Sequence, residues 1–246
     1  PMNQYKDLVQ KSLILRVILM KAILVCGGLG TRLRPHTYKT PKSMLPLGNR
    51  PIVGHLIELL RQNGVTEIYL TIGYLKEQFK EYFKDGSKFG VKIFYSEEDE
   101  NLNTAGSTLP IKDRFTGTFL VMMGDHFTEI DLKKMLKFHR EKGGIATVGL
   151  KSIETQIQYG VVELGGSRIK EFREKPKLLH YVNAGIYAFE PEIFDYIKEK
   201  EDYAKDVFPR LLKNKKQING YIFDERWLDI GQAEDYEKAH KLFSKK

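Results

Sequence analysis

The chain has 246 residues, of which 41% are hydrophobic and 29% charged, so it is long enough to bury a core without cross-links and too apolar to be intrinsically disordered. Its single cysteine, Cys26, excludes a disulfide framework and a cysteine-rich zinc module. The net charge of +8 favours anionic partners. Because no arginine-rich stripe is interleaved with aromatic residues, we expect phosphorylated small molecules rather than nucleic acid.

Residues 1–19 precede Met20, the second methionine of the sequence. The apolar run at 13–25 contains Arg16 and Lys21 and is too short for a membrane span, which needs roughly 18 uncharged residues. It leads directly into a glycine loop without a small-residue cleavage site, so we expect neither a signal peptide nor a membrane partner. We expect a cytoplasmic protein whose residues 1–19 are an appendage, either an amphipathic helix or an upstream start without consequence.

Beyond Met20, short runs rich in branched and aromatic residues alternate with segments of helical periodicity. We expect helices at 52–63, 74–83 and 131–142, the last of which begins after the capping residue Asp131 and ends at Gly143. The predicted strands of this half are residues 22–25, 67–72, 92–95, 119–123 and 146–150. Strands that alternate with helices predict an α/β fold with a mostly parallel, doubly wound, Rossmann-like sheet.

The pattern changes after residue 150. Residues 160–164 and 169–173 flank a Gly-Gly-Ser turn and predict a β-hairpin, and a further strand is expected at 182–189. Helices at 203–214 and 233–244 bracket a strand at 220–223. No linker rich in proline, glycine or serine separates the two halves, so we expect one domain at 20–246, with a first half at 20–150 and an elaborated second half at 151–246.

A glycine loop directly after the first predicted strand carries the strongest signal. Its sequence is Gly27-Gly28-Leu29-Gly30-Thr31-Arg32, and three glycines let backbone N–H groups approach a phosphate without interference from Cβ atoms. The dinucleotide fingerprint would need a glycine at Leu33, and the Walker pattern would need Gly-Lys-Ser/Thr further along; neither is present. The loop therefore predicts a phosphate site of another class, with a tight strand-to-helix turn as the structural alternative.

A proline-rich segment follows at 41–51, where three prolines stiffen the chain around Lys42. The glycine loop and this segment together resemble the signature of the sugar-1-phosphate nucleotidylyltransferases, in the family's order and at its spacing. These enzymes make a nucleotide-diphosphate sugar from a nucleoside triphosphate and a sugar 1-phosphate.

The resemblance continues downstream and extends from Met20 to Tyr236. Two departures stand out: Asn103 replaces the family's usual glycine but tolerates positive φ, and Cys26 replaces a small residue and is expected to be a small buried hydrophobe. The similar segments are Leu102-Asn103-Thr104-Ala105-Gly106, Gly124-Asp125, Tyr159-Gly160-Val161-Val162, Glu174-Lys175-Pro176, Asn183-Ala184-Gly185-Ile186-Tyr187 and Trp227-Leu228-Asp229-Ile230-Gly231.

The resemblance implies a role for each matching residue. Arg32 would clamp the β- and γ-phosphates, Lys42 would neutralise the α-phosphate or leaving group, and Lys175 would hold the attacking phosphate. Asp125 and Asp229 would hold Mg²⁺. The first half would bind the nucleotide, through Gly27, Gly28, Gly30, Thr31, Thr104, Ala105 and Gly106. The second half would bind the sugar phosphate, through Gly160, Glu174, Lys175 and Asn183.

The substrates are less specified than the reaction. The acidic run Glu97-Glu98-Asp99-Glu100 precedes the Thr-Ala-Gly loop, and a carboxylate accepts hydrogen bonds from guanine, whereas uracil or thymine favours an amide; a solvated acidic loop is the alternative. The resemblance is nearest the mannose-1-phosphate guanylyltransferase branch, which favours GTP and mannose 1-phosphate. A UTP- or dTTP-dependent glucose-1-phosphate enzyme is the alternative.

Two further questions concern activity and assembly. A catalytically silent subunit that senses nucleotide sugars is the competing class, but it would be expected to lose Arg32, Lys42 or the aspartates. No spacing makes His36, His126 or His139 a metal ligand or a partner of a nucleophile, so we interpret them as non-catalytic. The sequence leaves the oligomeric state open, a homo-oligomer included.

Overall fold

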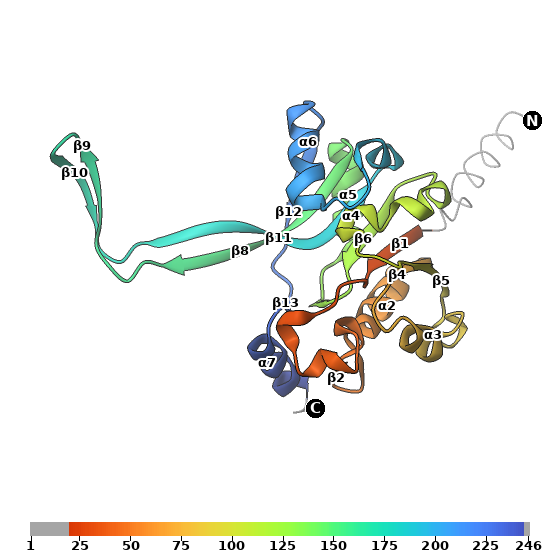
Figure 1. Ribbon diagram of the computed structural model, residues 1–246. Helices are drawn as coiled ribbons and strands as arrows, with labels where there is room; N and C mark the ends of the chain where they lie inside the picture. The colour runs from red at the N-terminus through yellow and green to blue at the C-terminus, as the bar shows by residue number, and fades with distance from the viewer. Residues whose placement is uncertain (1–19, 244–246) are drawn as a thin grey trace, which may run out of the picture.

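The strand β1 (Met20–Val25) lies near the middle of the sheet, as its residues require. Ala22, Ile23 and Leu24 are all fully buried, and since successive side chains of a strand point to opposite faces, both faces must be covered. The computed structural model describes residues 20–243 and places β1 in a seven-stranded sheet (Figure 1). In spatial order the strands are β12 (Ile218–Ile222), β8 (Ala146–Gln156), β11 (Lys177–Phe189), β6 (Phe119–Met123), β1, β4 (Val65–Ile72) and β5 (Lys92–Glu97).

The sheet is mixed, although most of its pairs are parallel. β1 runs parallel to β4 and β6, β4 to β5, and β8 to β12. Only β11 runs antiparallel to both of its neighbours, β6 and β8. The mostly parallel α/β fold predicted from the sequence is therefore confirmed, with β11 as the strand that reverses direction.

Helices cover the two faces and create two separate cores. On one face, Ala22 and Leu24 pack with α2 (Ile52–Gln62), α3 (Glu77–Phe83) and α5 (Leu132–Lys142). On the other face, Ile23 packs in a core with residues of η5 (Leu109–Arg114), η6 (Pro191–Tyr196), η7 (Tyr203–Val207) and α6 (Phe208–Lys213). The apolar faces of the amphipathic helices α2 and α5 pack in the first of these cores. Helices on both faces of the sheet agree with the predicted doubly wound arrangement.

A third, smaller core joins the end of the chain to its beginning. The helix α7 (Ala233–Phe243) buries Tyr236 and Ala239 against Leu47 and Phe127, and the hydroxyl of Tyr236 donates to the Pro46 carbonyl at 2.8 Å. Two short sheets support this core, one formed by β2 (Pro46–Leu47) and β3 (Arg50–Pro51) and the other by β7 (His126–Thr128) and β13 (Trp227–Asp229).

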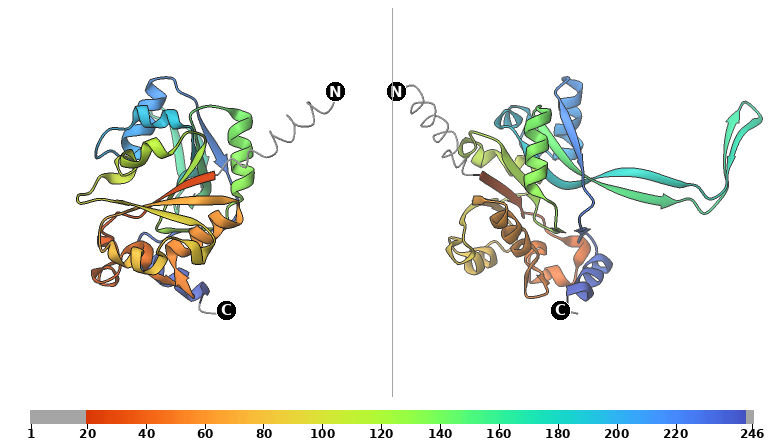
Figure 2. Two further views of the ribbon diagram at one scale, coloured as in Figure 1. Left: turned by 90° about the vertical axis from the view of Figure 1, so that its right-hand side faces the viewer. Right: turned by 180° about the vertical axis from the view of Figure 1, so that it is seen from behind.

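An extended arm projects from the sheet. Beyond the buried part of the sheet, β8 and β11 continue as a two-stranded ribbon that carries the hairpin β9 (Val161–Gly165) and β10 (Arg168–Arg173), far from the body of the molecule (Figures 1 and 2). We call residues 151–182 the arm; none of them is buried. The hairpin prediction is confirmed, but β8 runs beyond residue 150 and β11 begins before residue 182, because exposed strands lack the apolar run that marks a buried one.

The other sequence expectations differ from the structure in detail. The helix expected at 74–83 begins at Glu77, and the helix expected at 203–214 is divided into the π-helix η7 and the α-helix α6, with a proline in its first turn. Asp131 caps α5 as predicted, since its carboxylate accepts from the Lys134 amide at 3.0 Å. The appendage expected at 1–19 lies outside the described residues. No helix within residues 20–243 is long and apolar enough to cross a membrane.

Close packing joins the ends of β1 and β6. The Gly124 amide donates to the Val25 carbonyl at 2.9 Å, and a Cβ atom on Gly124 would lie 2.3 Å from the sulfur of Cys26. Cys26 is buried, as expected of a small hydrophobe, and burial raises the pKa of its thiol to about 12. Because a side chain at Gly124 would clash with Cys26, β1 and β6 can pack this closely only with glycine here. This contact fixes the backbone position of the next residue, Asp125.

We predict that Gly124→Ala lowers the free energy of unfolding by about 1–3 kcal/mol, because the added methyl group overpacks the junction. Urea denaturation measures the change, with Gly117→Ala as the matched control, since a Cβ on Gly117 meets no atom within 4 Å. Adding Cys26→Ala should recover part of the loss. Equal midpoints for the two glycine variants would contradict this account of the junction.

Candidate active site

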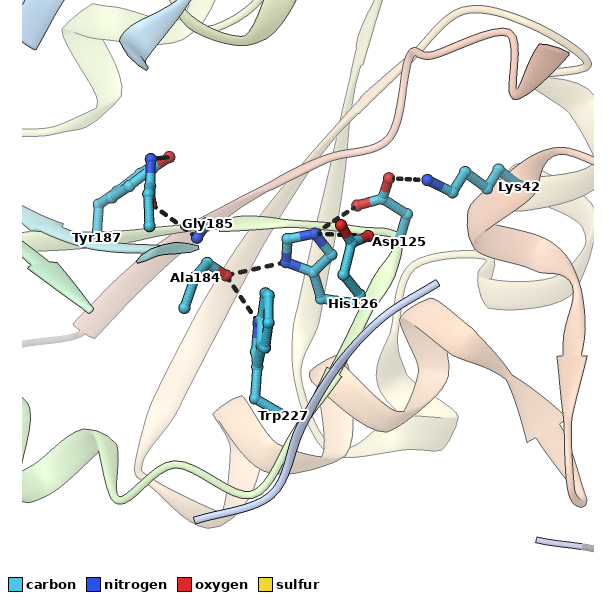
Figure 3. A network of polar contacts seen from close by, with 9 residues as sticks. Lys42, Asp125, His126, Ala184, Gly185, Tyr187 and Trp227 are labelled. Atoms are coloured by element: carbon cyan, nitrogen blue, oxygen red, sulfur yellow. Dashed lines mark hydrogen bonds and ion pairs between the residues drawn. The ribbon is translucent and has the colours of Figure 1, made fainter. Parts of the chain in front are cut away.

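Charged side chains gather beyond the carboxyl ends of β1 and β6. Lys42 begins η3 (Lys42–Met44), directly after Pro41, and its ammonium group forms an ion pair with Asp125 (Figure 3). Asp125 itself follows β6. Ligands of open α/β sheets bind outside the carboxyl ends of the strands, so the position agrees with a binding site.

The pairing of two short strands brings Asp229 to the same place. β7 and β13 are antiparallel, and their register sets Asp229 opposite His126. The Nε2 atom of His126 lies 3.5 Å from Asp125 Oδ1 and 3.4 Å from Asp229 Oδ1. Both aspartates therefore approach one imidazole nitrogen, although about a hundred residues separate them in the chain.

A bulge in β11 holds the imidazole from its other side. The Ala184 carbonyl accepts hydrogen bonds from His126 Nδ1 at 2.9 Å and from Trp227 Nε1 at 3.0 Å (Figure 3). The register of β11 shifts at this point, and Gly185 has φ +67 with no room for a side chain beside His126. Asn183 stabilises the bulge, because its Oδ1 accepts from the Gly185 amide at 2.9 Å. Its Nδ2 donates to the hydroxyl of Tyr187 at 3.0 Å.

The surroundings of His126 determine its charge. A carbonyl only accepts, so Nδ1 carries a proton, while Nε2 faces two carboxylates that favour a second proton. Burial would lower the pKa of His126, but the negative charges of Asp125 and Asp229 outweigh it and hold the pKa above its ordinary value. Burial likewise opposes ionisation of Asp125, yet His126 and Lys42 hold its pKa below the usual range. The two carboxylates thus favour the protonated form of the ring, and the ring and Lys42 in turn favour the ionised form of Asp125.

This donor set fits a hard divalent cation. The side chains of Asp125 and Asp229 are 28% and 52% exposed, so their oxygens remain accessible. Mg²⁺ is commonly held by one or two carboxylates together with water and substrate phosphates. Within residues 20–243 no group of three or more histidine, cysteine and acidic side chains has the geometry of a metal site. A cation here would accordingly depend on bound phosphates and water for its other ligands.

The glycine loop lies beside this cluster. Gly30 has φ +63, its carbonyl accepts from the Thr37 hydroxyl at 2.8 Å, and a Cβ on it would lie 3.1 Å from Lys42 Cβ. Gly28 is exposed, with open space where a side chain would be. Thr31 and Arg32 follow in η1 (Thr31–Leu33), and both are exposed. The pKa of Asp229 is lowered chiefly by its hydrogen bond with His126, and the charge of Arg32 adds a smaller effect in the same direction. The loop and Arg32 thus share one open surface with the aspartates.

At its other end the loop meets a buried acidic side chain. Glu98 is 8% exposed, a Cβ on Gly27 would lie 2.9 Å from its Oε2, and its Oε1 has no hydrogen-bond partner. Burial raises the pKa of Glu98 above its usual value. The other three acidic residues of the run are paired at the surface, Glu97 with Lys76 and Lys80, Asp99 with Lys76, and Glu100 with Lys200. Only Glu98 is directed toward the loop.

The segment Leu102–Gly106 is tied to the chain that follows residue 200. Asn103 has φ +59, which confirms that asparagine supports the turn where the family has glycine. The Thr104 hydroxyl donates to Asp202 at 2.8 Å, and the amides of Ala105 and Gly106 donate to the Glu201 carbonyl at 2.9 and 3.0 Å. These groups hold the segment in place, and their predicted contact with a nucleotide remains a prediction.

The remaining predicted residues lie on the arm. Gly160, Glu174 and Lys175 belong to the ends of the hairpin, which Figure 2 shows away from the body of the molecule. A Cβ on Gly160 would meet the ring of Phe172 at 2.7 Å, so this glycine allows close packing within the hairpin. The structure therefore brings Arg32, Lys42, Asp125 and Asp229 to one surface, with Asn183 behind it. The three residues of the hairpin ends, Gly160, Glu174 and Lys175, lie apart from that surface.

We predict that Glu98→Gln makes the protein more resistant to urea at pH 8 than at pH 4, relative to the wild type. A carboxyl whose pKa is raised on folding stabilises the fold at low pH and loses that contribution as the pH rises through the folded pKa. Glutamine cannot ionise and is spared this loss. Glu97→Gln is the control, because Lys80 and Lys76 lower the pKa of Glu97 and the sign should reverse. The same sign in both variants would contradict the burial argument.

The nucleotidyl transferase family profile matches residues 21–246. A UTP–glucose-1-phosphate uridylyltransferase of Synechocystis sp. is 38% identical over 241 residues, which cover 89% of this chain and 62% of the relative. The mannose-1-phosphate guanyltransferase of Saccharomyces cerevisiae is 36% identical over 234 residues, which cover 91% of this chain and 64% of the relative. The chain thus spans less than two thirds of the length of these curated relatives.

A solved structure supports the same placement. A putative glucose-1-phosphate thymidylyltransferase from Bacillus anthracis superposes with a TM-score of 0.73 at 26% identity, over 91% of this chain and 95% of that one. The match of the family profile to almost the whole described region, together with these similarities, shows that the chain belongs to the nucleotidyl transferase family.

Proposed function

We propose that this chain transfers a nucleotidyl group from a nucleoside triphosphate to a sugar 1-phosphate. The observation that carries the proposal is the gathering of Lys42, Asp125 and Asp229 beside an open glycine loop at the carboxyl ends of the strands. The two curated relatives bear names that describe this reaction with different nucleotides and sugars. Residues 20–150 would form the nucleotide-binding half and residues 151–246 the sugar-phosphate half, in a cytoplasmic enzyme.

The reaction needs charge neutralisation rather than a general base. An oxygen of the sugar phosphate attacks the α-phosphorus, a new P–O bond forms, and the bond to the bridging oxygen breaks so that pyrophosphate leaves. The attacking phosphate is largely dianionic near pH 7, because its second pKa is about 6. The barrier is repulsion between two anions, so cations and positioning supply the catalysis.

The chain supplies this positive charge from its own side chains. Arg32, exposed at the loop, would clamp the β- and γ-phosphates through its planar guanidinium group. Lys42 would neutralise charge at the α-phosphate once substrate competes with Asp125 for its ammonium group. Mg²⁺, when bound, would neutralise phosphate charge and orient the attacked phosphorus, with Asp125 and Asp229 as its protein ligands. His126, held by Ala184, keeps both carboxylates in position.

Glu98 favours guanine as the base. A buried carboxylate oxygen without a partner beside Gly27 matches the N1–H and N2–H₂ donors of guanine. Identities of 38% and 36% to a uridylyltransferase and a guanyltransferase do not distinguish the two nucleotides, so the preference for GTP depends on Glu98. The preference for mannose 1-phosphate depends on the sequence resemblance to the mannose-1-phosphate guanylyltransferase branch. A UTP- or dTTP-dependent glucose-1-phosphate enzyme is the alternative. A catalytically silent subunit that senses nucleotide sugars is disfavoured, because it would not need Arg32, Lys42 and the two aspartates, which are all present.

Replacing either aspartate should abolish most turnover. We expect Asp125→Asn and Asp229→Asn each to lose roughly 100-fold or more in kcat, and the double variant to be little worse, because groups that act as a unit are not additive. Pyrophosphate release from GTP and mannose 1-phosphate with Mg²⁺ is the measurement. Asp99→Asn is the control, since that side chain is 99% exposed. Independent, multiplying losses, or wild-type activity that survives removal of divalent cations by EDTA, would contradict a shared metal.

The role of Glu98 is tested by base preference. An amide matches uracil and thymine better than guanine, so Glu98→Gln should shift the ratio of kcat/KM for GTP over UTP by about tenfold or more toward UTP, as expected for one or two buried hydrogen bonds. All common nucleoside triphosphates are assayed against mannose 1-phosphate and glucose 1-phosphate. Glu97→Gln should leave the ratio unchanged. A ratio that does not respond to Glu98→Gln would remove Glu98 from base recognition.

A further inference from the structure

A turn in the second half of the chain holds a segment of the first half. The side-chain amide of Asn103 donates to the Lys200 carbonyl at 2.7 Å, and two backbone amides of the segment Leu102–Gly106 donate to the Glu201 carbonyl. A Cβ atom on Gly106 would lie 2.7 Å from the amide nitrogen of Lys200, so the two stretches of backbone touch. Residues that lie 97 positions apart in the sequence thus pack as one unit.

Asp202 is at the centre of this contact. Its Oδ2 atom accepts a hydrogen bond from the Thr104 hydroxyl at 2.8 Å. Its Oδ1 atom caps η7 by accepting from the amides of Ala204 and Lys205 at 2.8 and 3.2 Å. The Thr104 hydroxyl in turn accepts from the Tyr203 amide at 3.0 Å. One carboxylate oxygen of Asp202 therefore caps the helix, and the other ties Thr104 to it.

The segment also lies against the base of the glycine loop. Ser107, which follows the segment directly, has its hydroxyl 3.4 Å from the Thr71 hydroxyl, and both side chains are buried. The Thr71 carbonyl accepts from the amide of Cys26, the last residue before the loop, at 2.9 Å. Buried polar groups keep such partners because an unpaired group is costly. A displacement of Leu102–Gly106 would therefore disturb the place from which the loop starts.

The first residue of the segment meets Glu98, the carboxylate beside Gly27. Burial is the largest influence on the pKa of Glu98 and raises it, while hydrogen bonding by the Leu102 backbone and the Thr71 side chain lowers it. The Glu98 amide donates to the Ile72 carbonyl at 2.8 Å, which fixes its backbone at the end of β4. The carboxyl group of Glu98 thus contacts both the glycine loop and the start of the segment.

We propose that Asp202 is a positioning residue of the nucleotide site: through Thr104 it fixes the segment Leu102–Gly106, and with it Glu98, against the glycine loop. This proposal rests on the proposed function, because it takes the surface beside the glycine loop as the site of the triphosphate. Asp202 itself needs no contact with substrate. The second half of the chain, expected to hold the sugar phosphate, thereby also shapes the site of the nucleotide.

The expected consequence concerns binding rather than the chemical step. A segment that occupies its competent position for only a fraction of the time lowers the apparent affinity for a ligand by that fraction. The hydrogen bonds of the Asp202 carboxylate go to Thr104 and to the first turn of η7, not to the charged cluster of Lys42 and Asp125. Once the triphosphate is bound, the groups that neutralise its charge are therefore unchanged.

Two variants remove the hydrogen bond between Asp202 and Thr104 from opposite sides. Asp202→Ser keeps a capping oxygen for η7, since serine is a preferred N-cap residue, but its side chain is too short to reach Thr104. Thr104→Val keeps the shape of the side chain and loses the hydroxyl. Each should weaken binding of the triphosphate that the wild type uses best, GTP by our proposal, about tenfold in calorimetric titration with Mg²⁺, the scale of one hydrogen bond to a charged group. Asp202→Ser should keep kcat and the KM for mannose 1-phosphate within about twofold of the wild type, because only binding of the triphosphate is affected.

A double-mutant cycle tests whether the two side chains act together. If they share one hydrogen bond, the double variant should bind the triphosphate no more weakly than either single variant. Thr104→Ser retains a hydroxyl and should recover most of the affinity that Thr104→Val loses. Asp131→Ser is the matched control, because the same change at the cap of α5 should leave triphosphate binding unchanged. Losses that multiply in the double variant would overturn the proposal, since Thr104 and Asp202 would then act independently.

Hydrogen exchange gives a second readout that needs no substrate. The amides of Ala105 and Gly106 share the Glu201 carbonyl as acceptor, so their exchange reports how firmly the segment is held. Both should exchange faster in Asp202→Ser and in Thr104→Val than in the wild type. Exchange at the wild-type rate in both variants would overturn the positioning role.

The outcomes separate this inference from the proposed function. A wild-type chain that releases no pyrophosphate from any nucleoside triphosphate and sugar 1-phosphate would remove the proposed function, and with it this role of Asp202. An active wild type whose triphosphate affinity is the same in Asp202→Ser and Thr104→Val would overturn the inference alone. A loss of kcat in Asp202→Ser as large as its loss of affinity would also overturn it, because general damage to the fold affects both.

Discussion

The balance of charge around His126 is the interaction on which the rest of this structure depends. Two carboxylates from distant parts of the chain approach one nitrogen of His126, and Lys42 pairs with one of them. The carboxylates raise the pKa of His126, and a protonated ring between them would offset their mutual repulsion. The ring is held by a carbonyl of β11, at the bulge from which the arm departs. The central sheet, the short β7–β13 pair and the arm therefore meet at one group of side chains.

Sequence patterns could predict the sheet and part of the site for physical reasons. Ala22, Ile23 and Leu24 form an apolar run that only a strand covered on both faces can bury, and three glycines before Arg32 have few uses other than close approach. The convergence of Lys42, Asp125 and Asp229 followed only from the family resemblance, because no spacing rule joins residues so far apart.

Other features could not be predicted because they depend on tertiary contacts. β7 and β13 have three residues each, too few for any periodicity, yet their pairing is what sets His126 beside Asp229. The four acidic residues at 97–100 look alike in sequence, and only the packing against Gly27 selects Glu98 for burial. The length of the arm left no signal either, since its strands bury nothing.

The most direct test of the account is a crystal structure of the chain with Mg²⁺ and its nucleotide-sugar product, GDP-mannose by our proposal. We expect the cation to contact Asp125 and Asp229 at the distances typical of Mg²⁺, about 2.0–2.1 Å, with the product phosphates next to Lys42 and the glycine loop. A product bound elsewhere on the molecule, or phosphates bound without any cation at the two aspartates, would contradict the claim that this cluster of charges is the reaction centre.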